Sequence, residues 1–315
     1  MNILITGGCG HIGSHLVVPL ITRGDRVTLF DLHRKPIRES NALGHCELVE
    51  GNLSVEEDVV RAMAKRQYDI VFHLGAILSA KAEENPEMAI AVNFNGTFHV
   101  LEAARKHGVK KVVFASTAAT YGIGLPDSVP LDTPQWPITI YGVTKVAGER
   151  LGVYYQHRHG LDFRAVRFPA LVGPFRPMGG ASAYTSRLFD EAVFHGRYEF
   201  YVNPSTRISI LYMADAVQAL LGLADAPKEK LRQLAYTLHG LNPSAKEMAA
   251  AVKKHLPDVI FTYKPDPVLT PMVESWPKHL DDSAARRDWG WRPSYDLAMI
   301  TQEMIQILQA NPRGK

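Results

Sequence analysis

A tyrosine and a lysine stand four residues apart in the stretch YGVTKVAGER, at Tyr141 and Lys145. The stretch has helical spacing, and residues four apart on a helix share one face, with their Cβ atoms about 5–6 Å apart. A nearby ammonium group favours the charged form of a phenol, whose ordinary pKa is near ~10. The pair therefore suits a general base that takes a proton from an alcohol near neutral pH. By itself the spacing is common, and an exposed helix face is its alternative interpretation.

Hydroxyl side chains at Ser116 and Thr117 stand at the end of the apolar stretch KKVVFAST, which we predict to be a β-strand. Ligands of doubly wound sheets bind at the carboxyl ends of the strands. A hydroxyl group at that end can hold the substrate oxygen while the phenol of Tyr141 takes its proton. The two segments together predict a site for proton transfer from an alcohol.

A glycine-rich loop, ITGGCGHIGSHL, places Gly7, Gly10 and Gly13 at three-residue spacing between a predicted strand and a predicted helix. Glycines there let the turn close, let the backbone approach a pyrophosphate, and let the helix pack on the strand. The first N–H groups of the helix supply a binding site for phosphate. We therefore predict a dinucleotide site, although a glycine triplet alone would indicate only a tight turn.

The choice of dinucleotide depends on Asp31, which ends the next predicted strand, 18 residues after Gly13. A carboxylate there accepts hydrogen bonds from an adenosine ribose, and its charge repels a 2′-phosphate, which favours NAD over NADP. Arg34 and Lys35 follow closely and leave NADP open. With NAD bound, the substrate carbon would give hydride to the nicotinamide as Tyr141 takes the proton.

Composition places the chain among ordinary soluble globular proteins: it has 315 residues, 46% of them hydrophobic, and a net charge of +3. This balance gives no reason to expect nucleic acid or an anionic membrane as a partner. No apolar run approaches the ~20 residues that span a bilayer. The first strand starts at Asn2 and leaves no room for a targeting peptide, so we expect a cytoplasmic protein. Cys9 and Cys46 lack partners at metal-ligand spacing, and we expect neither a metal nor a disulfide framework.

Strand and helix patterns alternate through the first half of the chain, which predicts an α/β fold: a Rossmann-type doubly wound parallel sheet. After about residue 170 the regular alternation of strand and helix patterns ends, and we expect a smaller α/β substrate domain. We assign residues 1–170 to the cofactor domain, rejoined by about 206–235, and residues 171–205 and 236–315 to the substrate domain. Long helices are predicted over 85–108 and 141–160.

The glycine loop, the Tyr-x-x-x-Lys helix and the preceding hydroxyl resemble the extended short-chain dehydrogenase/reductase family, also called the NAD-dependent epimerase/dehydratase family, over nearly the whole chain. The resemblance implies Tyr141, Lys145 and Thr117 as catalytic residues, with Ser116 the weaker candidate for the catalytic hydroxyl. It also implies that Asn93 supports the active-site backbone or a water, and it assigns no chemistry to His11. The cofactor set that it implies is Gly7, Gly10, His11, Ile12, Gly13, Asp31, Asn52, Leu53, Leu74, Gly75, Ala76, Asn93, Ser116, Tyr141, Lys145 and Phe168.

Within that family, the stretch SWPKHLDDSAARRDWGW resembles the short-chain-type L-threonine 3-dehydrogenases, which oxidise the threonine β-hydroxyl with NAD. Part of this match concerns the fold, since Asp281 or Asp282 is expected to cap a helix that Gly290 ends. The resemblance implies a small-molecule substrate, and a homodimer that pairs the helix of Tyr141 with the helix near 88–106. The substrate set that it implies is Ser79, Thr117, Tyr141, Gly180, Ser182 and Trp276.

One departure leaves the substrate open. Where those enzymes read Gly-Gly-Thr-Thr-Asp-Tyr, this chain reads GGASAY, so that a hydroxyl and a carboxylate have become alanine. A site discriminates by pairing its buried polar groups with its substrate. A small sugar acid or another hydroxy acid is therefore an alternative substrate, with Arg176 and Arg187 either holding its anion or lying on the surface. A sugar-nucleotide epimerase that uses Arg207 for the nucleotide is the other alternative.

Overall fold

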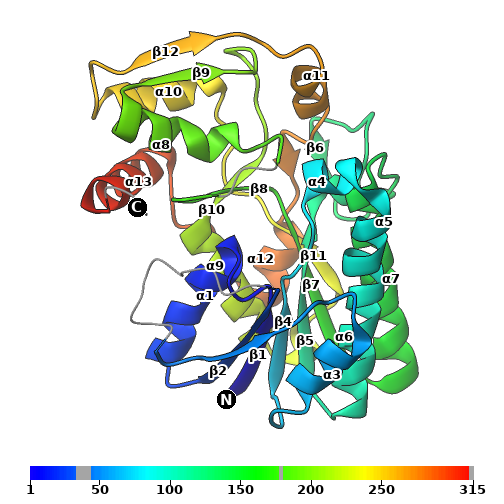
Figure 1. Ribbon diagram of the computed structural model, residues 1–315. Helices are drawn as coiled ribbons and strands as arrows, with labels where there is room; N and C mark the ends of the chain where they lie inside the picture. Colours follow the sequence, from blue (N-terminus) through cyan, green and yellow to red (C-terminus); the bar gives the residue numbers. More distant parts are fainter. Residues whose placement is uncertain (33–43, 177–179, 312–315) are drawn as a thin grey trace.

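The computed structural model describes residues 1–32, 44–176 and 180–311, and its centre is a single parallel sheet (Figure 1). The strand order is β11-β7-β5-β4-β1-β2-β3, with every neighbouring pair parallel. The predicted doubly wound α/β fold is confirmed. The strands of this sheet are β1 (Asn2–Thr6), β2 (Arg26–Asp31), β3 (Glu47–Glu50), β4 (Ile70–His73), β5 (Lys111–Thr117), β7 (Asp162–Phe168) and β11 (Ala235–Thr237).

Both faces of the sheet are buried, which explains the nearly continuous apolar runs in its strands. Successive side chains of a strand point to opposite faces. In β1, Ile3 and Ile5 belong to the core cluster on one face, and Leu4 belongs to the cluster on the other.

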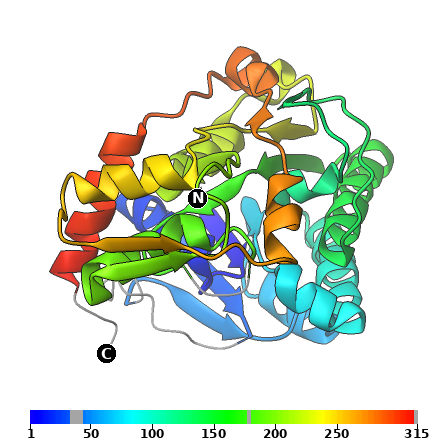
Figure 2. The same ribbon diagram turned by 90° about the horizontal axis from the view of Figure 1, so that it is seen from above.

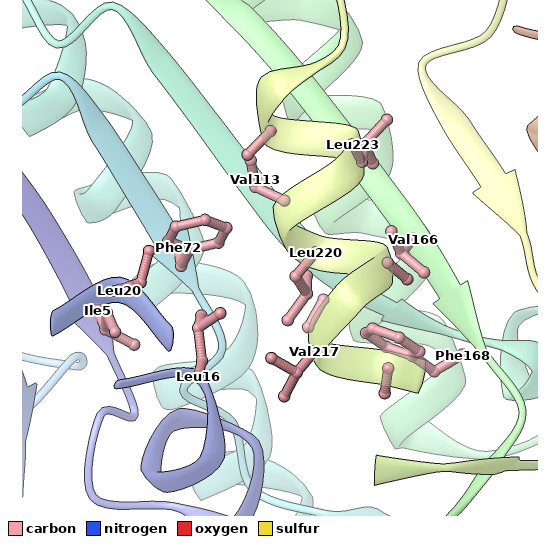
Figure 3. Close-up of a cluster of buried hydrophobic side chains, with 14 of the residues drawn as sticks. Ile5, Leu16, Leu20, Phe72, Val113, Val166, Phe168, Val217, Leu220 and Leu223 are labelled. Carbon is pink, nitrogen blue, oxygen red and sulfur yellow. The ribbon is translucent and has the colours of Figure 1, made fainter. Parts of the chain in front are cut away.

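Helices α1 (His11–Thr22) and α9 (Met213–Asp225) cover the first face. Figure 3 shows Val217, Leu220 and Leu223 of α9 turned toward the sheet, as the three- and four-residue spacing predicts. Leu16 and Leu20 of α1 lie beside Ile5 and Phe72 in the same view. A segment more than 190 residues away from α1 in sequence (213 against 22) thus completes the cover of this face.

On the second face lie α3 (Glu56–Met63), α6 (Gly96–Lys106) and α7 (Ile140–His159). The helix predicted over 85–108 is present, but it contains a π-helical stretch. It consists of α5 (Pro86–Ala89), the π-helix η1 (Ile90–Asn95) and α6. The short helix α4 (Ser79–Glu84) lies immediately before it. The helix predicted over 141–160 is α7, which starts after Thr139 and ends at Gly160, whose φ of 72° is left-handed.

Most of the remaining segments lie above the carboxyl ends of the strands in Figure 1, and together they form a second core. Figure 2 shows α10 and α13 side by side, on the side of the molecule away from α7. No helix in the described part of the chain is long and apolar enough to cross a membrane. The elements of this second core are β8 (Ala170–Val172), α8 (Tyr184–His195), β9 (Arg197–Phe200), β10 (Ile210–Tyr212), α10 (Ala245–Lys253), β12 (Ile260–Tyr263), α11 (Leu269–Glu274) and α13 (Leu297–Ala310). The other elements are η2 (Ala118–Thr120), β6 (Ser128–Val129), η3 (Lys228–Lys230), β13 (His279–Leu280) and α12 (Ser283–Trp289).

Two features bear on the predicted domain division. Strand β11 adds residues 235–237 to the main sheet, and α12 places Ala284 and Ala285 in the core cluster that α1 and α9 share. Both segments extend beyond residues 206–235, the stretch that was predicted to rejoin the cofactor domain. The division into two units therefore stays a prediction, with these residues contributing to the sheet side.

The predicted cap of α12 involves one of the two aspartates. Asp281 accepts a hydrogen bond from the backbone N–H of Ser283 at 2.9 Å. Asp282 instead accepts from the Arg286 side chain and from Nε1 of Trp291. Gly290 ends the helix with a φ of 75°, as expected.

Candidate active site

Thr117 and Tyr141 meet where strand β5 ends and helix α7 begins. The Thr117 hydroxyl lies close enough to the Tyr141 phenol to lower the pKa of that phenol. Gly142 makes this approach possible, because a Cβ atom at that position would lie 2.5 Å from the carbonyl oxygen of Ala119. The predicted base and the predicted substrate-holding hydroxyl are thus side by side.

Lys145 lies one helical turn further along α7 and is buried. Its Nζ atom donates to the carbonyl of Ala115 at 2.7 Å and lies 5.8 Å from the centre of the Tyr141 ring. Burial lowers the pKa of Lys145 to about 7, against an opposing effect of the Glu149 carboxylate. The lysine is therefore held firmly by the backbone of β5, and its charge is sensitive to its surroundings near neutral pH.

The expected lowering of the Tyr141 pKa does not occur in the chain by itself. Burial raises the pKa of this phenol to about 12, and the nearby Thr117 hydroxyl and the charge of Arg176 oppose the rise. Desolvation penalises the phenolate more than these two groups favour it. The phenolate therefore needs further positive charge from a bound group.

A buried ion pair lies behind Lys145, and the sequence reasoning missed it. Both carboxylate oxygens of Glu149 accept from Arg167, at 2.9 and 2.8 Å, and the Ser116 hydroxyl donates to Glu149 at 2.5 Å. Ser116 is thus committed to this network, which leaves Thr117 as the hydroxyl beside Tyr141. Two signals were present in the sequence: Glu149 is four residues after Lys145, and Arg167 interrupts an apolar strand.

The glycine loop has the shape that a dinucleotide phosphate needs. Gly7 has a left-handed φ of 68°, and a Cβ atom on Gly13 would lie 2.6 Å from the carbonyl oxygens of Gly7 and Gly8. Helix α1 follows with no side-chain cap at Gly10 and no acidic residue in its first turn. The N-terminus of the helix thus keeps its positive potential for an anion.

Asp31 lies at the end of β2, against the same loop. Its Oδ2 atom accepts from the backbone N–H of Cys9 at 2.9 Å, and its Oδ1 atom accepts from Leu32 at 2.8 Å. The carboxylate is therefore oriented by the loop at the point where a ribose would lie. Arg34 and Lys35, which bear on the choice between NAD and NADP, lie outside the described residues.

Other members of the predicted cofactor set line the carboxyl ends of β3 and β4. The side-chain oxygen of Asn52 accepts from the N–H of Ser54, and the Leu53 side chain is buried. Gly75 packs so closely on the loop that a Cβ atom on Gly7 would lie 2.6 Å from its Cα atom. Leu74, Gly75 and Ala76 are half-buried there, and Ile12 is half-buried at the start of α1.

Asn93 lies in the π-helix and supports the backbone after β4. Its side chain accepts from the N–H of Ile77 at 2.8 Å and donates to the carbonyl of Ile77 at 3.0 Å. A π-helical turn aims a residue differently from the α-helix around it. The implied role of Asn93 as support for the active-site backbone fits these two bonds.

Phe168, another member of the implied cofactor set, packs its side chain within the core (Figure 3).

His11 connects the glycine loop with the segment after β8. Its Nε2 atom lies 3.1 Å from the carbonyl oxygen of Pro174. Burial lowers its pKa to about 3, and the charges of His15 and Arg176 act in the same direction. His11 is therefore neutral at physiological pH.

Apart from Thr117 and Tyr141, the predicted substrate residues lie in three places. Gly180 and Ser182 lie beside Arg176, whose Nη2 atom donates to the Ser182 hydroxyl at 2.7 Å. Ser79 begins α4, which packs against α7. Trp276 lines a cavity of about 160 Å³ with residues 124–127. Arg187 pairs with Glu191 at 2.8 Å on the surface of α8.

Comparisons with known proteins agree with this geometry. The family model described as "NAD dependent epimerase/dehydratase family" matches residues 3–238. The mitochondrial L-threonine 3-dehydrogenase of Bos taurus is 37% identical over 97% of this chain and 82% of its own length. A monomeric L-threonine 3-dehydrogenase from a metagenome has a TM-score of 0.91 at 36% identity, covering 98% of this chain and 99% of its own. The UDP-glucose 4-epimerase of Thermotoga maritima has a TM-score of 0.86 at 25% identity, with 98% and 99% covered.

These similarities confirm the predictions of an NAD-dependent dehydrogenase and of NAD as its cofactor. Since the bovine relative is named as mitochondrial, the cytoplasmic location stays a prediction. The matched region contains the glycine loop, Asp31, Thr117, Tyr141 and Lys145, so the geometry and the comparisons concern the same residues. The chain belongs to the NAD-dependent epimerase/dehydratase family.

Proposed function

We propose that this protein oxidises the β-hydroxyl group of a small, threonine-like β-hydroxy acid with NAD. The observation that carries the proposal is that the Thr117 hydroxyl, at the carboxyl end of β5, lies close enough to the Tyr141 phenol to act on its pKa. A substrate hydroxyl bound between these two groups would contact both of them. The similarity to threonine dehydrogenases over almost the whole chain supports the choice of alcohol.

In the proposed reaction, Thr117 donates a hydrogen bond to the substrate oxygen and Tyr141 takes the proton of the substrate hydroxyl. NAD, when bound, supplies the acceptor for the hydride that leaves the same carbon, so the alcohol becomes a ketone and NADH forms. The loop of Gly7, Gly10 and Gly13 would hold the pyrophosphate, and Asp31 the adenosine ribose. The carbonyl of Ala115 holds the Lys145 ammonium group near Tyr141, where its positive charge favours the phenolate.

The direct test follows absorbance in the NADH band with the purified protein. L-Threonine, both enantiomers of 3-hydroxybutyrate, small sugar acids and UDP-sugars are added singly, with NAD and with NADP. We expect NADH to form with at least one β-hydroxy acid and to form faster than NADPH. NADH formation with none of the acids would contradict the proposal.

A sugar-nucleotide epimerase is the second candidate, since a relative in the same family has that activity. The structure offers less support for it, because Arg207 is already engaged. Its Nη2 atom pairs with Glu247 at 2.7 Å, and its Nη1 atom donates to the carbonyl of Asn242 at 2.9 Å. An epimerase would convert a UDP-sugar without net release of NADH, which separates the two functions.

We also propose a homodimer formed through α5, η1, α6 and α7. Large apolar side chains are exposed along these helices, including Phe98 at 43% and Tyr154 at 54% of their surface. The helices pack against each other, so the exposed side chains belong to neighbouring elements. Contiguous exposed apolar surface is typical of protein–protein contact. The exposed members are Met88, Ile90, Phe94, Phe98, Val143, Val153 and Tyr154.

A further inference from the structure

Arg176 is directed into the active site by an unusual backbone. Phe175, immediately before it, has a φ of 58°, a left-handed value seen at no other non-glycine residue in the described ranges. Such a conformation costs of order 1–3 kcal/mol and persists only where its surroundings impose it. The turn brings the Arg176 guanidinium close enough to both His11 and Tyr141 to act on their charge states.

The guanidinium is anchored by neutral oxygen atoms. Its Nη1 atom donates to the carbonyls of Leu171 and Ser182, at 2.8 and 3.2 Å, and its Nη2 atom donates to the Ser182 hydroxyl. Within residues 1–32, 44–176 and 180–311, no carboxylate forms an ion pair with Arg176, although most arginines of the chain have one. Its positive charge is therefore held in place but not neutralised.

Some donors of Arg176 remain available. A guanidinium has two N–H bonds on each Nη atom and one on Nε. The partners among the described residues occupy both bonds of Nη1 and one bond of Nη2, which leaves Nε–H and one Nη2–H. The Nε atom is not among the buried side-chain atoms without a partner, so it retains accessible surface. Two neighbouring N–H groups of this kind match a carboxylate.

Residues 180–183, the described segment beside Arg176, carry no carboxylate for a substrate ammonium group. Ala181 and Ala183 are buried on either side of Ser182 and carry no charge. The acidic group nearest Lys145 is Glu149, and both of its oxygens bind Arg167. Near Tyr141, Arg176 and Lys145 supply positive charge, His11 is neutral, and the Glu83 carboxylate accepts a hydrogen bond from the backbone N–H of Ile140.

We propose that Arg176 binds the carboxylate of the substrate, and that the preferred substrate is a β-hydroxy acid without an α-ammonium group. This inference rests on the proposed function and names its substrate class. Arg176 acts as the specificity-determining residue: its free N–H edge holds the acid group while the β-hydroxyl reaches Thr117 and Tyr141. A zwitterion such as L-threonine would bring its ammonium group toward the positive charge of Arg176, and residues 180–183 offer no carboxylate to receive it.

The test uses ligands that differ by one group. 3-Hydroxybutyrate has the carbon skeleton of L-threonine without the ammonium group, and its methyl ester lacks the carboxylate charge. Each ligand is titrated against the full-length protein loaded with NADH, with NADH fluorescence as the binding signal. The same ligands are then assayed for turnover with NAD.

For the unmodified protein we expect 3-hydroxybutyrate to bind about 10- to 100-fold more tightly than its methyl ester, the effect of a charge-assisted hydrogen-bonded pair. We also expect it to bind more tightly than L-threonine. Equal binding of acid and ester, or no binding of the acid, would overturn the role of Arg176. Tighter binding or faster turnover of L-threonine would overturn the substrate class.

Variants separate the arginine from the rest of the site. Arg176→Gln should remove the preference for acid over ester, and Arg176→Lys should keep part of it, because lysine retains the charge without the planar fork. Arg61→Gln, an ion-paired arginine on α3 whose side chain is 53% exposed, is the control and should bind like the unmodified protein. An acid preference that survives in Arg176→Gln, in protein with unchanged thermal stability, contradicts the proposal. If Arg176→Gln does not fold, the comparison of acid with ester in the unmodified protein decides.

The readout also separates the two proposals. If the acid binds with the expected preference but no NADH forms with any β-hydroxy acid, the proposed oxidation fails and the binding role of Arg176 stands. If NADH forms and the acid preference is absent, the oxidation stands and Arg176 is not the carboxylate-binding residue.

Discussion

Lys145 lies beneath the ring of Tyr141, with its Nζ atom 5.8 Å from the ring centre, and donates to the Ala115 carbonyl. Burial favours the neutral form of both groups: it lowers the pKa of Lys145 to about 7 and raises that of Tyr141 to about 12. The chain without cofactor thus holds a neutral phenol beside a lysine that titrates near neutral pH. Positive charge from bound NAD adds to that of Arg176 and Lys145 and favours the phenolate.

Tyr141→Phe should lower kcat by about 10²- to 10⁴-fold, the usual contribution of a general base. NAD binding should change little, because the pyrophosphate and the adenosine ribose are held by the glycine loop and Asp31. The measurement is steady-state turnover together with an NAD titration. Tyr154→Phe, an exposed tyrosine on the same helix, is the control. Retention of full turnover in Tyr141→Phe would exclude the phenol as the base.

Lys145 predicts a pH dependence of stability in the absence of NAD. Its folded pKa of about 7 lies below the ordinary value of 10.5, so between these values the unfolded chain binds the proton that the folded chain has released. The free energy of unfolding should therefore rise with pH from about 7, by at most ~1.4 kcal/mol per pH unit from this group. Urea denaturation of the protein and of Lys145→Met at pH 6 and pH 9 isolates the effect. The protein should gain stability relative to the variant at pH 9, and a relative loss would reverse the assignment.

Glu149→Gln should destabilise the fold by about 3–5 kcal/mol, because it leaves the buried Arg167 guanidinium without its carboxylate. Both side chains of this pair are at most 8% exposed. Glu191→Gln breaks a matched arginine pair whose side chains are 37% and 26% exposed, and it should cost less than about 1 kcal/mol. Denaturant midpoints of the two variants give the comparison. Equal losses would mean that the buried network contributes nothing specific.

Asp31→Ser should shift cofactor preference toward NADP by at least about tenfold, because the substitution removes the charge that repels a 2′-phosphate. The quantity to measure is the ratio of kcat/KM for NAD to that for NADP. Absolute affinity for NAD should also fall, since Asp31 orients the loop through Cys9. Asp258→Ser, an exposed aspartate elsewhere, should leave the ratio unchanged. An unchanged ratio in Asp31→Ser would assign the selectivity to other residues.

Phe98→Glu should convert the proposed dimer into a monomer by placing a charge in its apolar face. Sedimentation velocity at several concentrations gives the oligomeric state. Ile260→Glu introduces the same charge at a residue that is 63% exposed on β12, and it should not change that state. A monomeric unmodified protein, like the metagenomic relative, would refute the dimer.

Local patterns in the sequence predicted much of the fold and the reaction. The glycine loop, Asp31 at a strand end, and the four-residue spacing of Tyr141 and Lys145 each depend on neighbours a few residues away. Strand and helix periodicity also predicted the parallel sheet, because both faces of its strands are buried. The π-helical stretch at 90–95 was not predicted, since its apolar spacing resembles that of an ordinary helix.

Contacts between distant segments decided the rest. The Glu149–Arg167 pair, the turn that aims Arg176 at the site, and the return of α9 to the sheet all require the folded chain. The direction of the Tyr141 pKa belongs here too. A sequence shows which charges are near a phenol along one helix, but desolvation depends on everything that packs around it. The sequence by itself thus predicted the cofactor loop and the proposed proton-transfer pair, and the tertiary structure decided the direction of their pKa shifts and the position of Arg176 beside Tyr141.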